Sequence, residues 1–192
     1  MNLQNNAIVL QKETQWLQSV IHQRIRNTGN KEFSIYDSRQ PELDSAPTAY
    51  SDFIKKCNLS FDERALLILA LVPHIDPTLL SHYSSDKFNL EDRYIFLLGS
   101  SGHNYKGLLP TGLTFLFLMA GSNMNLRLKL QHLLSSRNVL AEHNVVSLEP
   151  HYKGEPCFSG KIMMSESFVE LFTIGEVNKK DSIKYSFNKE SL

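Results

Sequence analysis

The sequence predicts a mainly helical domain of the α+β class, built as a winged-helix-like helical domain with a C-terminal β-hairpin wing. Two runs of eight apolar residues, 65–72 and 113–120, have the composition of buried helices. Two β-prone segments follow later, at 145–148 and 160–164, and a short helical segment closes the pattern. Several helices, then a hairpin, then a final helix is the element order of a winged-helix module.

The first 45 residues are expected to form a helix and an extended connection that precede this domain. Apolar residues at helical spacing, including Leu17 and Ile21, predict an amphipathic helix over residues 6–26. Residues 27–47 are rich in Asn, Ser, Asp, Pro and Gly, a composition typical of an extended surface connection. The winged-helix-like domain is expected to span residues 46–176.

Start and stop signals divide the next part of the chain into short helices. Residues 50–57 repeat apolar side chains at i, i+3, i+4 and i+7, which predicts a short helix. Ser60 and Glu63 have capping-box spacing, so the central apolar helix is expected to begin at Ser60. Pro73 is expected to end that helix, and Asp76 with the proline after it to begin another short one.

The second half of the chain mixes strand and helix signals. The aromatic and branched segment 94–98 predicts a strand that enters a Gly-rich hairpin. An apolar helix is expected over residues 110–121, followed by a third helix over residues 123–134. This third helix takes the place of the recognition helix in a winged helix, and residues 145–164 form the wing. A final helix over residues 166–173 closes the domain.

Composition limits the class of protein. The chain has 192 residues, 42% of them hydrophobic, which suits one domain of about 150 residues with tails, or two small lobes. Lys plus Arg and Asp plus Glu are both 20, so no net charge attracts the chain to nucleic acid or anionic lipid. Its apolar runs are far shorter than the ~20 residues of a membrane span. Two distant cysteines, Cys57 and Cys157, and a polar N-terminus predict a reducing cytoplasm.

Three strings of the sequence, taken in order, resemble a known family. They are LSFDERALLILALVPHIDPTLL, GHNYKGLLPTGLTFLFLMAG and LAEHNVVSLEPHYKGEPCFSGKIMMSESFVELFTIGE. Together they resemble the amino-terminal domain of a group of AAA+ ATPases common in Bacteroidetes, some encoded with extracellular contractile injection systems. The resemblance covers residues 46–176 and implies a winged-helix variant placed before an ATPase module.

The resemblance also implies a function and a set of partners. The family's nucleotide chemistry belongs to a module with a phosphate-binding loop and an acidic metal-binding strand, and no part of this sequence matches either. We therefore expect no catalytic residue, no enzyme activity and no cofactor in this chain. The expected role is recognition of a protein substrate or adaptor. The polar segment 177–192 is expected to be a linker or tail, the start of a connection to a C-terminal AAA+ module if the native chain continues.

Two kinds of chemical site are disfavoured by the spacing of their residues. The loop 99–107 has the glycine content of a phosphate-binding loop, but Lys106 is not followed by Ser or Thr, so a hairpin turn is favoured. Seven histidines invite a metal site, yet pairs such as His74 and His82 lie eight residues apart rather than at i, i+4. No metal site is expected.

DNA binding by a winged-helix regulator is the alternative function. Between residues 122 and 141 the only charged residues are Arg127, Lys129 and Arg137, all of them basic. Arg127 and Lys129 lie about 200° apart on a helix, however, so they do not form one phosphate-binding stripe. The favoured interpretation is that they are ordinary solvated cations.

A protein-docking patch is the candidate partner-binding site. Leu128 points away from the leucine stripe of its helix, so it is either a second core contact, the interpretation slightly favoured, or an exposed docking residue. Tyr152, Phe158 and Met163 lie in or near the expected wing and extend the candidate patch. With the neighbouring Arg127 these are the candidate partner-binding residues.

Overall fold

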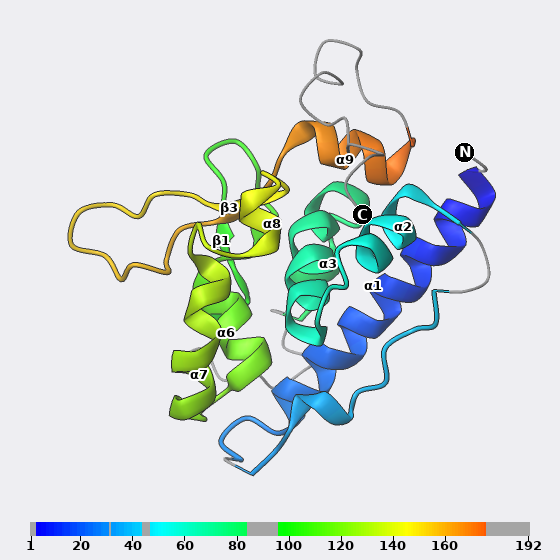
Figure 1. The fold of residues 1–192 in the computed structure, drawn as a ribbon. Helices are drawn as coiled ribbons and strands as arrows, with labels where there is room; N and C mark the ends of the chain where they lie inside the picture. The colour runs from blue at the N-terminus through cyan, green and yellow to red at the C-terminus, as the bar shows by residue number, and fades with distance from the viewer. Residues whose placement is uncertain (1–2, 31, 44–46, 84–95, 176–192) are drawn as a thin grey trace.

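The computed structural model describes residues 3–30, 32–43, 47–83 and 96–175, and the fold is mainly helical with two small antiparallel sheets (Figure 1). The predicted α+β class is confirmed. The predicted linker at 177–192 lies outside the described residues. In chain order the elements are α1 (Leu3–Arg26), η1 (Ile35–Asp37), α2 (Ala49–Lys56), α3 (Phe61–Ile75), α4 (Leu79–His82), η3 (Phe96–Leu98), β1 (Ser100–Ser101), β2 (Leu108–Leu109), α6 (Gly112–Ala120), α7 (Met124–Leu130), η4 (Gln131–Leu134), α8 (Val139–Glu142), β3 (Val146–Leu148), β4 (Ile162–Met164) and α9 (Glu166–Thr173).

Three helices whose sequences differ in character form the centre of the core. Helices α3 and α6 are apolar around most of their circumference, and residues 64–72 and 114–120 are buried without exception. Helix α1 is amphipathic and packs against both of them, and against α9. The two apolar runs therefore lie at the centre of the domain, as predicted.

Helix α1 belongs to the same core as the domain predicted at 46–176. Its apolar stripe is buried, with Leu17, Val20 and Ile21 all at 1% exposure or less. Asn6 Nδ2 donates to the carbonyl oxygens of Phe172 and Thr173, both at 2.8 Å, and so joins the start of α1 to the end of α9. The first and last described helices are thus held together where the start of α1 meets the end of α9 (Figure 1).

Two helix boundaries differ from the prediction. Pro73 does not end α3, which continues to Ile75. A proline in the last turn removes only one backbone donor, and the amide of Asp76 still reaches the Val72 carbonyl at 2.8 Å. Helix α4 has Thr78 as its N-cap instead of Asp76, because the Asp76 carboxylate accepts hydrogen bonds from the amide and hydroxyl of Thr78 in a local turn.

The prediction of a strand at 94–98 is wrong for residues 96–98, the part that the structure describes. Residues 96–98 form the 3-10 helix η3, which packs on α6 and buries Leu98 completely. Tertiary burial overrides the local β-propensity of this segment. The hairpin predicted next to it is present but shifted along the chain, because Ser100 pairs with Leu109 and Ser101 with Leu108.

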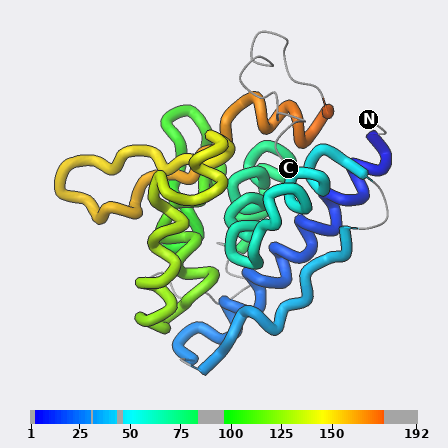
Figure 2. The backbone as a smooth tube through the Cα atoms, viewed as in Figure 1, coloured from blue at the N-terminus to red at the C-terminus, as the bar shows by residue number. Residues whose placement is uncertain are grey.

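The second hairpin forms from the two segments predicted to be its strands. In β3 and β4, Val146 pairs with Met164 and Leu148 with Ile162. The residues before α6 lie along the other side of β4, where Thr111 bridges Lys161. Helix α9 occupies the predicted residues 166–173. Figure 2 shows the connection between β3 and β4 extending away from the helical body.

The predicted third helix is divided in two. Residues 124–130 form the α-helix α7, and the 3-10 helix η4 continues it to Leu134. Asn123 caps α7 by accepting a hydrogen bond from the amide of Leu126 at 3.1 Å. No helix in the described part of the chain combines the length and apolar composition that crossing a bilayer requires.

Candidate functional site

A pocket of about 600 Å³ lies where the β3–β4 hairpin meets the segment from η4 to α8. One wall comes from both strands, and the other comes from residues 133–144, which precede β3 in the chain. Helix α8 packs against β3 (Figure 1). The lining residues are Leu66, Leu133, Leu134, Ser135, Ser136, Asn138, Ala141, Asn144, Val146, Ser147, Leu148, Ile162, Met163, Met164, Ser165 and Glu166.

The wall between η4 and α8 is held in place by one buried side chain. Asn138 Oδ1 caps α8 by accepting from the amides of Leu140 and Ala141, at 3.0 and 3.1 Å. Its Nδ2 donates to the carbonyl oxygens of Leu133 and Ser135, at 3.0 and 2.6 Å. All the polar valences of this amide are used within the wall, so the pocket is preformed rather than loosely enclosed.

The chemistry of the lining is apolar and hydroxyl-bearing. Among the described residues that line it, Glu166 is the single ionisable one, and none is histidine, cysteine, lysine or arginine. The one candidate base in this lining is the Glu166 carboxylate, and among the described residues no hydrogen bond joins it to a serine hydroxyl of the pocket, as an activated nucleophile would require. This arrangement suits binding through apolar contacts and hydrogen bonds.

The five residues predicted to bind a partner do not form one surface. Met163 is 43% exposed and lines the pocket. Tyr152 is 77% exposed but borders a different hollow, between the β3–β4 connection and β1. Phe158 is half-buried and packs against the core. Leu128 is 57% exposed on α7, so it is a surface residue and the core-contact alternative is wrong.

Arg127, the fifth of these residues, is engaged within the fold. Its guanidinium donates to the Gly121 carbonyl at 3.0 Å, next to the end of α6. Partial burial lowers the pKa of this guanidinium below its ordinary value. The favourable place of a cation at a helix C-terminus accounts for its position. Exposed Met124 and Leu128 lie one turn apart on the outer face of α7 and form a small separate apolar pair.

Sequence reasoning missed the wall at residues 133–144. Its signal is present in the sequence, because Asn138 stands directly before the short helical segment of α8 in the N-cap position. The composition of residues 133–144 is typical of a polar surface segment. Their position beside β3 depends on tertiary contacts that no local sequence pattern predicts. Only Met163 among the predicted residues belongs to the pocket.

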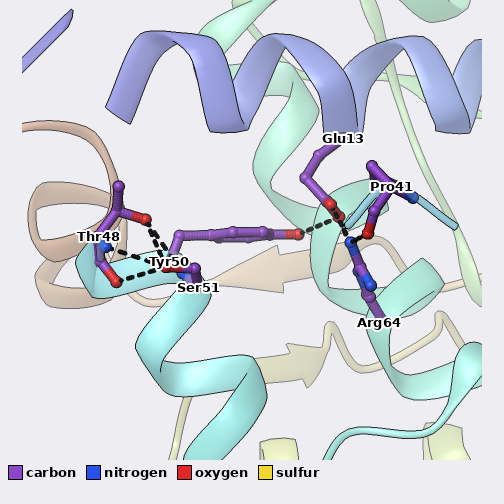
Figure 3. Close-up of polar contacts among 6 residues, drawn as sticks. All are labelled: Glu13, Pro41, Thr48, Tyr50, Ser51 and Arg64. Carbon is purple, nitrogen blue, oxygen red and sulfur yellow. Dashed lines mark hydrogen bonds and ion pairs between the residues drawn. The ribbon is translucent and has the colours of Figure 1, made fainter. Parts of the chain in front are cut away.

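A cluster of ionisable groups away from the pocket is formed by Glu13, Tyr50 and Arg64, all buried (Figure 3). Glu13 of α1 accepts from Arg64 Nε at 3.1 Å and from the Tyr50 hydroxyl at 3.2 Å, and a second contact joins the two charged groups. Arg64 also donates to the Pro41 carbonyl at 2.8 Å. Burial, and then the nearby Glu13 carboxylate, raises the pKa of Tyr50 well above its ordinary value. With Tyr50 and Glu13 at 0% exposure, the cluster joins α1, α2 and α3 and has no access to a substrate.

The N-terminus of α6, which follows the glycine-rich loop, has no free amides for a phosphate in its first three residues. The first amides of α6 are already bonded: Gly112 to Gly160 O at 3.1 Å, Leu113 to Phe158 O at 2.9 Å, and Thr114 to Thr111 Oγ1 at 3.1 Å. An anion at a helix N-terminus needs such amides to be free. Across the described ranges no group of three His, Cys, Asp or Glu side chains could hold a metal ion.

Comparisons of the chain with protein-family models, with curated proteins and with solved structures each gave no match.

Proposed function

We propose that this chain is a recognition domain of winged-helix type, which binds a protein substrate or adaptor and serves as the N-terminal domain of an AAA+ ATPase. The observation that carries this proposal is the pocket of about 600 Å³ beside the hairpin, whose described lining residues include a single charged one, Glu166. Its lining favours protein segments with uncharged side chains, because burying a charge without a partner is unfavourable.

The order of elements supports the winged-helix part of the proposal. In space, segment 110–112 lies beside β4, and β4 lies beside β3. Along the chain, α6, α7, η4 and α8 come between segment 110–112 and β3. Helix α3 packs under β4, in the place of the first helix of a winged helix. The resemblance of residues 46–176 to AAA+ N-terminal domains agrees with this order and supplies the proposed context.

Protein binding is favoured over DNA binding by the state of the basic residues. Arg127 is half-buried and its guanidinium already donates to the Gly121 carbonyl. That leaves Lys129 and Arg137 as the exposed cations of this region, on a chain whose formal net charge is zero. A duplex-binding surface needs more cations on one face.

A peptide-display library panned against the full 192-residue chain tests the proposed function. We expect recovered peptides to lose binding to Ser136→Trp, which fills the pocket from its exposed rim, and to keep binding to Ser101→Trp on β1. Both variants place one tryptophan on an exposed serine, so the pair controls for added surface hydrophobicity. Failure to recover any pocket-dependent peptide would count against a recognition role.

Two further measurements separate the alternatives. Fluorescence anisotropy of a labelled DNA duplex measures whether the chain binds DNA. We expect no salt-dependent binding that is lost when Lys129 and Arg137 are both replaced by alanine. Such binding would favour the DNA-binding regulator instead. Sequencing the native gene downstream of this segment is expected to show a phosphate-binding loop, and a stop codon there would remove the AAA+ context but not the recognition role.

A further inference from the structure

The two edges of the β3–β4 hairpin differ in their hydrogen bonding. On β4, the Ile162 amide donates to the Pro110 carbonyl at 2.8 Å, and the Gly160 carbonyl accepts from Gly112 at 3.1 Å. Segment 110–112 thus covers the outer edge of β4. The outer edge of β3 has no equivalent strand beside it in the described part of the chain.

The register shows which groups of β3 point outward. The Glu149 amide donates to Lys161 O at 2.8 Å, and Val145 O accepts from Ser165 at 3.0 Å. The backbone N–H and C=O groups of the odd-numbered residues of β3 therefore point toward β4. Those of Val146 and Leu148 point away from it. Within the described ranges no hydrogen bond reaches these outward groups.

This edge lies at the pocket. Val146, Ser147 and Leu148 all line it, and residues 133–144 form the opposite wall. Unpaired strand groups are a template for another strand, which adds about 4.8 Å away. Other proteins bind extended peptides in this way, with main-chain bonds giving affinity and side-chain pockets giving selectivity.

We infer that the occupant of the pocket is an extended segment of a partner protein, which adds as a strand to the free edge of β3. This inference rests on the proposed recognition function and specifies how it operates. The segment has uncharged side chains along the pocket and a basic residue at the end near Glu166, because that carboxylate is the single charge of the lining. An acidic segment is disfavoured.

The probe for the test is the tightest hexapeptide recovered from the display library, measured against the full chain by calorimetry. Leu148→Pro removes one outward N–H without touching the bonds between β3 and β4, and Leu148→Ala loses a similar side chain but keeps that N–H. We expect Leu148→Pro to bind the hexapeptide about tenfold more weakly than Leu148→Ala, the effect of one lost backbone hydrogen bond.

A second measurement leaves the protein unaltered, in case the proline variant fails to fold. Methylating the backbone nitrogens of the hexapeptide one at a time is expected to weaken binding at alternate positions only, because every second amide of an added strand faces β3. Replacing the basic residue of the hexapeptide by glutamate is expected to weaken its binding to the unaltered chain by about tenfold or more. The same replacement is expected to weaken binding to the Glu166→Gln variant by less than about threefold, because that variant lacks the carboxylate.

The outcomes separate this inference from the function on which it rests. A hexapeptide that depends on Ser136 but shows no alternation and no difference between the two Leu148 variants would support recognition and overturn strand addition. A concentration-dependent dimer that Leu148→Pro dissolves would assign the edge to a second copy of the chain and also overturn it. Recovery of no pocket-dependent peptide would contradict both.

Discussion

Glu13 and Arg64 form an ion pair whose side chains are 1% and 7% exposed. Transfer of such charges from water is unfavourable, and their mutual attraction offsets it only when further hydrogen bonds satisfy both groups. Tyr50 and the Pro41 carbonyl provide those bonds (Figure 3). The ring of Trp16 lies 5.6 Å from the guanidinium carbon and adds a cation–π contact.

Glu13→Gln is expected to lower the free energy of unfolding by about 3 kcal/mol, because it leaves a buried guanidinium without its counter-charge. Urea titration at pH 7 measures the change. Arg39→Ala is the matched control, since it breaks the Arg39–Glu42 pair whose side chains are 84% and 72% exposed, and is expected to change stability by less than about 0.5 kcal/mol. Equal effects of the two variants would show that burial of the first pair is unimportant.

Tyr50 gives the fold a dependence on alkaline pH. Its pKa in the folded state is raised by burial, so the unfolded chain releases the phenolic proton first, near pH 10. The stability contributed by this group is present below pH 10 and is lost as pH rises above it. Between pH 9 and 11, Tyr50→Phe is expected to lose about 1.4 kcal/mol less than the unaltered chain. Urea titrations at both pH values test this, and equal losses would contradict it.

At the scale of elements, helix caps decide where the short helices begin. Thr111 and Thr114 form a capping box at α6, in which Thr111 Oγ1 accepts from the Thr114 amide at 3.1 Å and Thr114 Oγ1 from the Thr111 amide at 2.9 Å. Thr111→Ala is expected to cost about 1 kcal/mol. Ser165→Ala is the matched control, because Ser165 occupies the N-cap of α9 without a side-chain capping bond. Its expected effect in the same urea titration is less than half as large.

The end of α6 is closed by a side chain from α1. Arg24 donates from Nε to Leu118 O and from Nη2 to Met119 O, both at 2.9 Å, where the helix exposes unpaired carbonyl groups. Burial lowers the pKa of Arg24 to about 10. Its guanidinium passes so close to Gly121 that a Cβ there would lie 2.5 Å from Nη1. The contact between α1 and α6 therefore requires glycine at this position.

Gly121→Ala is expected to destabilise the domain by at least about 2 kcal/mol, through a positive φ and the displacement of Arg24. Gly154→Ala is the control, because Gly154 also has positive φ but no atom within 4 Å of an added Cβ. Its cost is expected near 1 kcal/mol. When Arg24 is also replaced by alanine, the difference in stability between Gly121→Ala and Gly154→Ala should shrink, because the clash with the guanidinium is gone. Thermal denaturation of the two glycine variants, each with and without Arg24→Ala, measures this. An unchanged difference would show that the clash is unimportant.

At the scale of the whole molecule, α1 is part of the domain and not an appendage. Seven of its apolar residues are buried in the common core: Val9, Leu10, Trp16, Leu17, Val20, Ile21 and Ile25. Their burial is worth about 10 kcal/mol or more, which matches the entire stability of a typical domain. Removal of residues 1–30 is therefore expected to abolish cooperative unfolding, as monitored by circular dichroism. Removal of residues 1–4 is expected to preserve it, because Leu3 and Gln4 are exposed.

Much of the fold could be predicted because helix formation depends on neighbouring residues. The capping box at Ser60 and the final helix at 166–173 are present where the sequence predicts them. The candidate site could be predicted only at Met163. The other wall of the pocket depends on how residues 133–144 pack beside β3. Strand propensity alone does not predict which edge of a hairpin remains unpaired.

The sequence by itself determined the mainly helical class, the two apolar helices of the core and most helix ends, since these follow from periodicity and capping within a few residues. The tertiary structure alone decided the partnership of Glu13 with Arg64, which are 51 positions apart, and the replacement of a predicted strand by η3. It also decided the pocket beside β3. Contacts between distant segments override local preference because burial of whole side chains outweighs the small energies of intrinsic propensity.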